Sequence, residues 1–115
     1  MQNVLNFYRK NTSVISISVC DYQFNTGDTI YFTVKTAPDS SQNDSTALIK
    51  ADWTIGTDVD INDDGTIDLK LSADATDIAY GQYFYDLKLV SVDDTAENTL
   101  VTGNLNILDV ATLRV

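Results

Sequence analysis

Residues 80–90, with the sequence YGQYFYDLKLV, decide the fold of this chain. Within them Tyr83, Tyr85, Leu87 and Leu89 share one parity, whereas the other parity mixes aromatic, charged and aliphatic side chains. Such an alternation in aromatic and branched residues predicts a β-strand with one buried face. Because a single strand leaves that face uncovered, the stretch also predicts a further sheet packed against it.

The same alternation recurs on both sides of this stretch. It predicts strands within residues 15–19, 30–34, 47–55, 67–71 and 101–107, together with a short apolar segment at 4–8. Val59 and Ile61 keep the parity of the 47–55 strand and are expected to continue it. Polar turn sequences separate them at 25–28, 62–65 and 93–98, and the Asp-Gly at 64–65 is typical of a hairpin. Since no run keeps a helical period beyond one or two turns, helical crossovers and a parallel sheet are not expected. The predicted fold class is all-β, an antiparallel β-sandwich of seven to eight short strands.

The chain length of 115 residues allows one sizeable core, so we expect a single β-sandwich domain over residues 1–115. Residues 36–46 contain the only proline, Pro38, among polar residues, which predicts an exposed and mobile loop. Beyond the last predicted strand, Val110, Leu113 and Val115 extend the apolar character. Two interpretations of residues 108–115 stay open: a tail that contacts a neighbouring protein, and a frayed terminus.

The chain is acidic, with a formal net charge of −10. Such a surface repels phosphate backbones and anionic membranes, so neither nucleic acid nor a membrane is expected as a partner. Histidine is absent and Cys20 is the only cysteine, which removes the commonest general base and any internal disulfide. We therefore expect no enzyme activity. No segment has the order of a signal peptide, which predicts synthesis in the cytoplasm.

Residues 60–68, DINDDGTID, match the first nine places of a calcium loop of the EF-hand kind. The predicted oxygen ligands are Asp60, Asn62, Asp64, the Thr66 carbonyl and Asp68. The twelfth place, which should hold a bidentate Glu, is Leu71. Two interpretations stay open, a solvated acidic turn and a weak calcium site, and no other cofactor is expected.

Three further sets of residues each have a functional and a structural interpretation. Asp74, Asp77 and Asp86 are candidates for a carboxylate pair in acid-base chemistry, or are simply solvated. Trp53 is in phase with its apolar neighbours, which favours a core residue over a carbohydrate platform. Either Tyr80 or Tyr83 is placed to bond back to the preceding corner, as in a tyrosine corner, and Ser72 is placed to cap a helical turn.

Outward-facing apolar residues predict a docking surface. Tyr31, Phe84 and Val90 lie out of phase with the buried positions of their strands. An exposed apolar patch of this kind is typical of a site that meets another protein. Together with Val110, Leu113 and Val115, these residues are the predicted protein contacts.

Several stretches together resemble small immunoglobulin-like β-sandwich proteins of tailed bacteriophages, such as the N-terminal domains of baseplate upper proteins. They are FYRKNT at 7–12, GDTIYFTVK at 27–35, ALIK at 47–50, GTIDLKLSADAT at 65–76, GQYFYDLKLV at 81–90 and TLVTG at 99–103. In the first of them Lys10-Asn11-Thr12 replaces the Gly-Asp-Thr that such proteins tend to show.

The resemblance implies an immunoglobulin-like sandwich and a non-enzymatic virion structural protein, either a head, neck, tail or baseplate component. Such a protein works by docking and self-assembly. Its expected partners are other virion proteins and itself, as a homo-oligomer, and its expected localisation is the virion after synthesis in the host cytoplasm. The alternative is a calcium-stabilised or ligand-binding immunoglobulin-like module.

Overall fold

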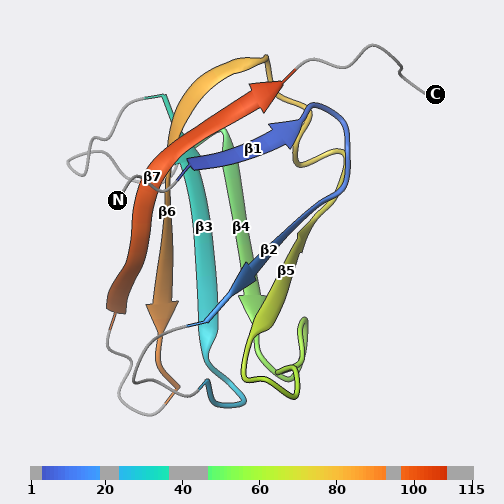
Figure 1. The fold of residues 1–115 in the computed structure, drawn as a ribbon. Helices are drawn as coiled ribbons and strands as arrows, with labels where there is room; N and C mark the ends of the chain where they lie inside the picture. The colour runs from blue at the N-terminus through green and yellow to red at the C-terminus, as the bar shows by residue number, and fades with distance from the viewer. Residues whose placement is uncertain (1–3, 19–23, 37–46, 93–96, 109–115) are drawn as a thin grey trace.

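Strands make up the regular structure of this chain. The computed structural model describes residues 4–18, 24–36, 47–92 and 97–108. The strands are β1 (Val4–Tyr8), β2 (Ser13–Ile17), β3 (Thr29–Lys35), β4 (Ile49–Thr54), β5 (Ile67–Leu71), β6 (Gly81–Val90) and β7 (Glu97–Leu108) (Figure 1). Over these described ranges there is no helix. The all-β prediction is therefore confirmed.

The strands form a five-stranded sheet in the order β1-β7-β6-β3-β4 and a two-stranded sheet of β2 and β5. All pairs are antiparallel except β1 with β7, which run parallel with Phe7 opposite Ile107. The prediction of a wholly antiparallel fold is therefore wrong at this pair. It assumed that a parallel pair needs a crossover helix, but here the entire domain connects the two strands, which come from opposite ends of the described chain.

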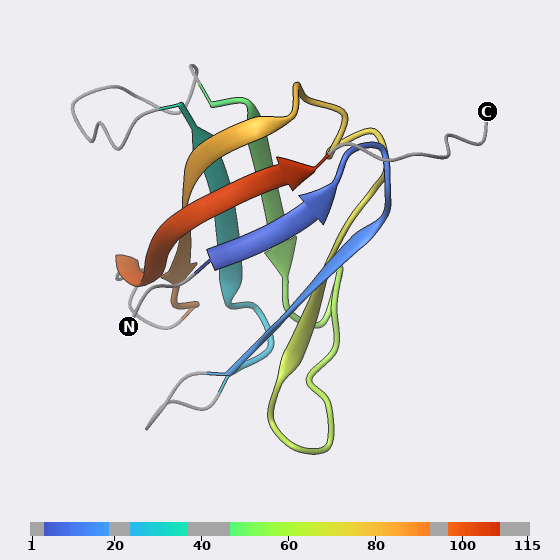
Figure 2. The same ribbon diagram turned by 45° about the horizontal axis from the view of Figure 1, so that its top comes forward.

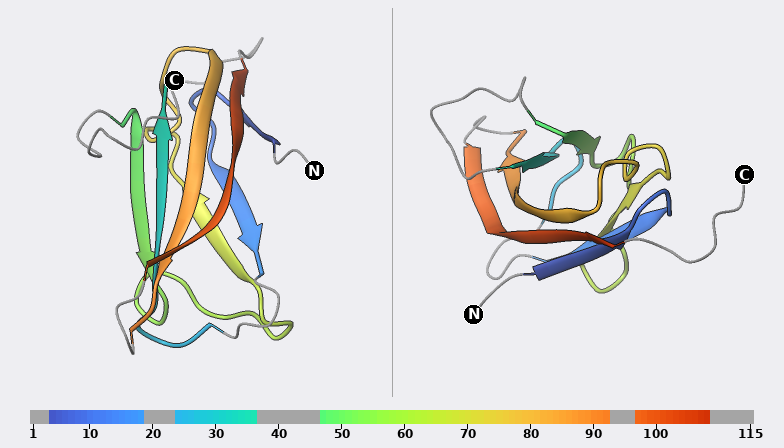
Figure 3. Two further views of the ribbon diagram at one scale, coloured as in Figure 1. Left: turned by 90° about the vertical axis from the view of Figure 1, so that its left-hand side faces the viewer. Right: turned by 90° about the horizontal axis from the view of Figure 1, so that it is seen from above.

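The five-stranded sheet curls because its longest strands bend. β6 pairs with both β3 and β7, and a register shift between Leu87 and Lys88 marks a bulge against β7. A bulge increases the local twist of a strand. Figure 3 shows β6 and β7 curving so that their sheet wraps towards β2 and β5, with β1 carried on the outer strand.

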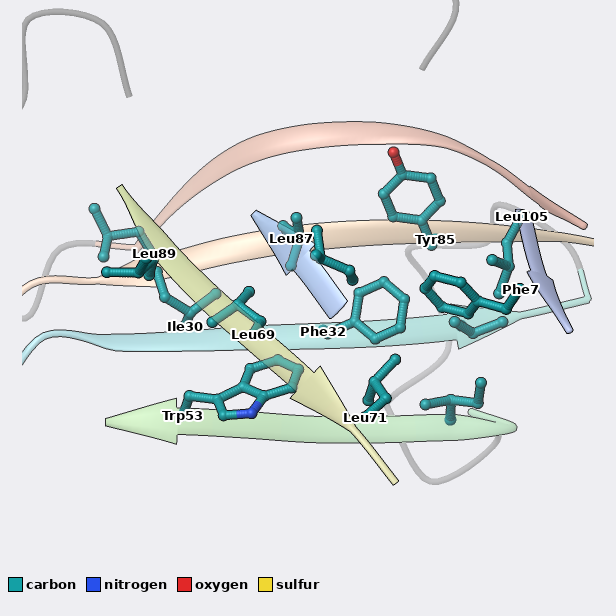
Figure 4. Close-up of a cluster of buried hydrophobic side chains, with 14 of the residues drawn as sticks. Phe7, Ile30, Phe32, Trp53, Leu69, Leu71, Tyr85, Leu87, Leu89 and Leu105 are labelled. Atoms are coloured by element: carbon teal, nitrogen blue, oxygen red, sulfur yellow. The ribbon is translucent and has the colours of Figure 1, made fainter. Parts of the chain in front are cut away.

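Both sheets contribute to one hydrophobic core. Along β6 the residues Tyr83, Tyr85, Leu87 and Leu89 are buried, as their alternation predicts. Leu69 and Leu71 of β5 lie over the strands of the larger sheet (Figure 4). Aromatic rings fill the centre, with the Phe32 and Tyr85 centroids 5.7 Å apart at a tilt of 45°. Tilted contacts of this kind suit the ring quadrupoles.

Trp53 connects the two sheets. Its side chain on β4 is only 7% exposed, which confirms the core interpretation against the carbohydrate platform. The indole Nε1–H donates to the Lys70 carbonyl of β5 at 3.2 Å. A buried indole needs such an acceptor, so this bond satisfies the ring and fixes the position of β5 over β4.

The segment between β4 and β5 differs from the sequence prediction. Val59 and Ile61 do not continue a strand: they form isolated bridges with Ile55 and Ile67, and Ile61 is exposed. The predicted turn at 62–65 is present, since the Gly65 N–H donates to the Asn62 carbonyl at 2.9 Å. However, β5 pairs along its length with β2 instead of returning along a hairpin partner. Pairing with β2 therefore holds the apolar face of β5 against the core.

The corner before β6 is held by two local bonds. The Tyr83 hydroxyl donates to the Ala79 carbonyl at 2.6 Å, as a tyrosine corner requires, whereas Tyr80 is exposed. The Ser72 hydroxyl accepts from the Ala75 N–H at 3.2 Å, so Ser72 caps a turn as predicted, although no helix follows in this described stretch. Together these bonds set the angle at which the chain enters β6.

Candidate functional site

The acidic turn between Asp60 and Asp68 is closed by its own side chains. The Asp64 carboxylate accepts from the Thr66 hydroxyl at 2.6 Å and from the Thr66 N–H at 3.1 Å. The Asn62 amide donates to the Thr66 hydroxyl at 3.0 Å and to the Asp68 carboxylate at 3.3 Å. Gly65 has a φ of 85°, a left-handed conformation that glycine adopts without strain. These bonds define a tight polar turn.

Hydrogen bonding also sets the ionisation of Asp64. The two bonds from Thr66, the hydroxyl first, hold the pKa of the Asp64 carboxyl below its ordinary value. Both donors stabilise the charged carboxylate more than the neutral acid. Asp64 is therefore a structural acceptor in this turn and stays ionised at neutral pH.

A cleft of about 410 Å³ lies beside this turn. Three Asp side chains and one Asn, together with Trp53, Val59 and Lys70, line it, the acidic ones being Asp58, Asp60 and Asp68. Its acidic side chains are partly engaged, because Asp58 accepts from the Thr54 N–H at 2.9 Å and Asp68 accepts from the Ser16 hydroxyl at 2.6 Å. Trp53 also lines the cleft but is buried, so it offers no exposed ring face on which a sugar could stack.

The five predicted calcium ligands lie in one segment, but four of them, Asn62, Asp64, Thr66 and Asp68, bond to one another. Within the described residues no group of three or more Asp, Glu, His or Cys side chains is placed to hold a metal ion. The Thr66 carbonyl accepts from the Asn62 N–H at 2.8 Å across the turn. Calcium needs six to eight oxygens converging on one point, so this arrangement does not fit the ion as it stands. The calcium site stays a prediction.

The predicted contact residues Tyr31, Phe84 and Val90 lie on one face, the outer face of the five-stranded sheet. Cross-strand pairing places Tyr31 opposite Lys88, and Val90 opposite Thr29. On β6 the charged Asp86 and Lys88 separate Phe84 from Val90. Two small apolar areas therefore replace the single patch that the sequence predicted.

The proposed acid-base carboxylates lie in two separate places. Asp77 forms an ion pair with Arg9 at 3.1 Å, and its N–H donates to the Asp74 carbonyl at 3.2 Å in the turn before β6. Asp86 lies in the middle of β6, opposite Thr33 and Thr102. The structure therefore separates Asp86 from Asp74 and Asp77, and it pairs Asp77 with Arg9.

Asp28 is an important residue that sequence reasoning missed. It is 0% exposed, and its carboxylate accepts from the backbone N–H groups of Asn25 at 3.0 Å and of Val92 at 3.0 Å. Its own carbonyl accepts from the Ile55 N–H at 2.8 Å. Asp28 therefore joins three loops at one end of the fold. The only signal in the sequence is its place in a polar turn, which suggests a solvated residue instead.

The three predicted contacts at Val110, Leu113 and Val115 fall on residues outside the described part of the chain, and so does Cys20. Most of the loop at 36–46 also lies outside it.

Where the structure is described, no helix has the length and apolar character to cross a membrane. Comparison with known proteins adds no relative, since no family model, curated protein or solved structure matches this chain.

Proposed function

We propose that this chain is a non-enzymatic structural protein of a bacteriophage virion that acts by docking onto copies of itself and onto other virion proteins. The observation that carries the docking role is the exposure of large apolar side chains on strands. Val4, Tyr8, Tyr31 and Leu108 are each at least 37% exposed, although the core is well filled. Exposed apolar residues that gather on one surface favour protein contact. The virion assignment depends on the sequence resemblance described above.

An immunoglobulin-like sandwich is the fold that we propose for this role. The sheet order β7-β6-β3-β4 follows the G-F-C-C′ order of a variable-type domain, and β2 with β5 follows its B–E pair. The Tyr83 hydroxyl at the start of β6 fits the tyrosine corner at the start of strand F. Two features depart from that pattern: Trp53 lies on β4 instead of on the C strand, and a single cysteine cannot form the inter-sheet disulfide.

The chemistry of the described surface supports a passive role. Of the three candidate carboxylates, Asp77 is paired with Arg9 and Asp86 lies within a strand, and the described residues that line the cleft include no hydroxyl or thiol side chain. Because histidine is absent from the sequence, the commonest acid-base and nucleophile arrangements cannot be built. The folded chain therefore offers surfaces for contact more than groups for reaction.

The proposal is tested by finding the chain in particles. We expect mass spectrometry of density-purified phage particles to detect it at a fixed ratio to the major capsid protein, with an abundant host protein as the control for carry-over. We also expect its gene to lie among capsid, portal or tail genes. Detection only in the soluble fraction of the lysate, or a gene set among metabolic enzymes, would contradict a virion role.

A further inference from the structure

Among the described residues, one corner of the outer face has no charged side chain, although the chain as a whole has a net charge of −10. It is formed by the outward side chains of three neighbouring strands, from Val4–Tyr8 of β1, residues 104–108 of β7 and residues 82–84 of β6. We call it the uncharged face. None of these positions is Asp, Glu, Lys or Arg. Figure 2 shows β1 and β7 side by side at this surface.

An amide row crosses the middle of the uncharged face. Asn106 pairs with Asn6 on one side and with Gln82 on the other, so the three side chains lie abreast. The Asn106 amide donates to the Asn6 oxygen at 3.0 Å. Each amide both donates and accepts hydrogen bonds, so such a row is complementary to a second copy of itself.

Two mainly apolar rows, one of them with Asn104 at its centre, flank the amide row. Val4 and Phe84 lie on either side of Asn104, and Tyr8 lies opposite Leu108. Tyr8 is the most exposed of them, at 51%. A two-fold axis along the amide row would place each amide opposite its own copy and each apolar row opposite the other. Apart from Asn104, which would face Leu108, the pattern is therefore self-complementary, as an isologous contact requires.

The geometry points to a second copy of this chain as the occupant of the uncharged face, an inference that depends on the proposed docking function and gives it a location. Charge supports this choice. Two copies that carry −10 each repel one another, and the repulsion is smallest where both contact surfaces are neutral. Interfaces of proteins are depleted in charge at their centres, and the centre of this face is a row of neutral amides.

The area predicts a weak contact. Three strands about 4.8 Å apart and three outward rows about 6.8 Å apart cover roughly 300 Å² per copy. A standard interface buries about 800 Å² per partner, so the isolated chain should form only a transient dimer. We expect a dissociation constant between high micromolar and millimolar.

Sedimentation equilibrium tests the inference. The apparent mass should rise from the 12.7 kDa of the monomer towards twice that value as the concentration approaches about 1 mM. Added salt should strengthen the association, since about 0.5 M salt screens the repulsion between acidic copies while the contact itself holds no ion pair. Concentration-dependent amide shifts in NMR should map to β1, the end of β7 and the start of β6.

The sharpest variant is Asn6→Asp, because the new carboxylate still accepts from Asn106 but places a charge at the centre of the face. We expect it to weaken the dimer at least about tenfold. Asn98→Asp makes the same change at an exposed position of β7 outside the face and should have little effect. Tyr8→Asp on the face is compared with Val14→Asp on β2, an exposed apolar position in the other sheet, with the melting temperature as the check on folding.

The overturning results are distinct from those for the virion role. A chain that stays monomeric at about 1 mM, or an Asn6→Asp dimer as strong as that of Asn98→Asp, would exclude the second copy. Shifts that map to Tyr31 and Val90 would also exclude it. Binding to neutral phosphatidylcholine vesicles that Tyr8→Asp abolishes would assign the face to lipid instead. None of these outcomes affects detection of the chain in purified particles.

Discussion

Tyr83→Phe removes one hydroxyl and leaves the rest of the fold intact. The hydroxyl donates to the Ala79 carbonyl at 2.6 Å, while the ring is 8% exposed and packs in the core. Phenylalanine keeps that ring burial, so the change isolates the hydrogen bond. A typical intramolecular bond contributes about 1 kcal/mol net, and the exposed Ala79 segment allows water to satisfy the freed carbonyl. We therefore expect a loss of ~1 kcal/mol in the free energy of unfolding.

Tyr85→Phe is the matched control for this change. Tyr85 lies two places along the same strand with its ring 6% exposed, and its hydroxyl points away from the core cluster (Figure 4). No hydrogen bond of that hydroxyl occurs in the described structure. Urea denaturation should show a lower midpoint for Tyr83→Phe, with a fall in melting temperature of about 4 °C, and almost no change for Tyr85→Phe. Equal effects of the two variants would show that the corner bond does not hold β6 in place.

Four further changes test other parts of the structure. Leu69→Ala opens a cavity where the side chain is 0% exposed and should cost about 3 kcal/mol by urea denaturation, against less than about 0.5 for the exposed Val14→Ala. Lys10→Gly should stabilise the chain by about 0.5–1 kcal/mol, because Lys10 holds a left-handed φ of 62°; a loss would show that its side chain matters more than its backbone. Thr66→Val should raise the Asp64 pKa towards its ordinary value in an NMR titration. In the wild-type chain the folded pKa of Asp64 is lower than the unfolded one. The stability that the Thr66 bonds add is therefore present above the unfolded pKa and is lost as the pH falls through the folded pKa. Calcium at about 1 mM should raise the melting temperature by less than about 2 °C, and a larger rise that Asp60→Asn abolishes would establish the calcium site.

The strands were predictable because a strand that is buried on one side must alternate. The parity of β6 alone identifies Tyr83, Tyr85, Leu87 and Leu89 as core residues. Pairing was not predictable in the same way. The alternation shows which side of a strand is buried, but it does not show which other strand pairs with it. For this reason the parallel β1–β7 pair and the β2–β5 pair became visible only in the structure.

The candidate sites could not be predicted from the sequence for the same reason: they depend on pairing between distant segments. Asp28 looks like any acidic turn residue in sequence, and its burial depends on Val92, which is 64 positions away. The uncharged face combines residues from both ends of the chain with the start of β6, and no local pattern connects them. The acidic turn shows the opposite case, since its calcium motif is local and complete for nine places, yet the structure uses those side chains to close the turn.

A weak interface is suited to the proposed assembly. In solution, a contact of roughly 300 Å² leaves the chain mostly monomeric at micromolar concentration, and its acidity keeps it soluble. Once copies are attached to a common particle, their effective concentration reaches millimolar values, and the same contact forms without any new interaction. Assembly would then depend on attachment to the particle first. A variant such as Asn6→Asp should accordingly still bind the particle but fill it with less order, whereas a variant that cannot attach should be absent from it.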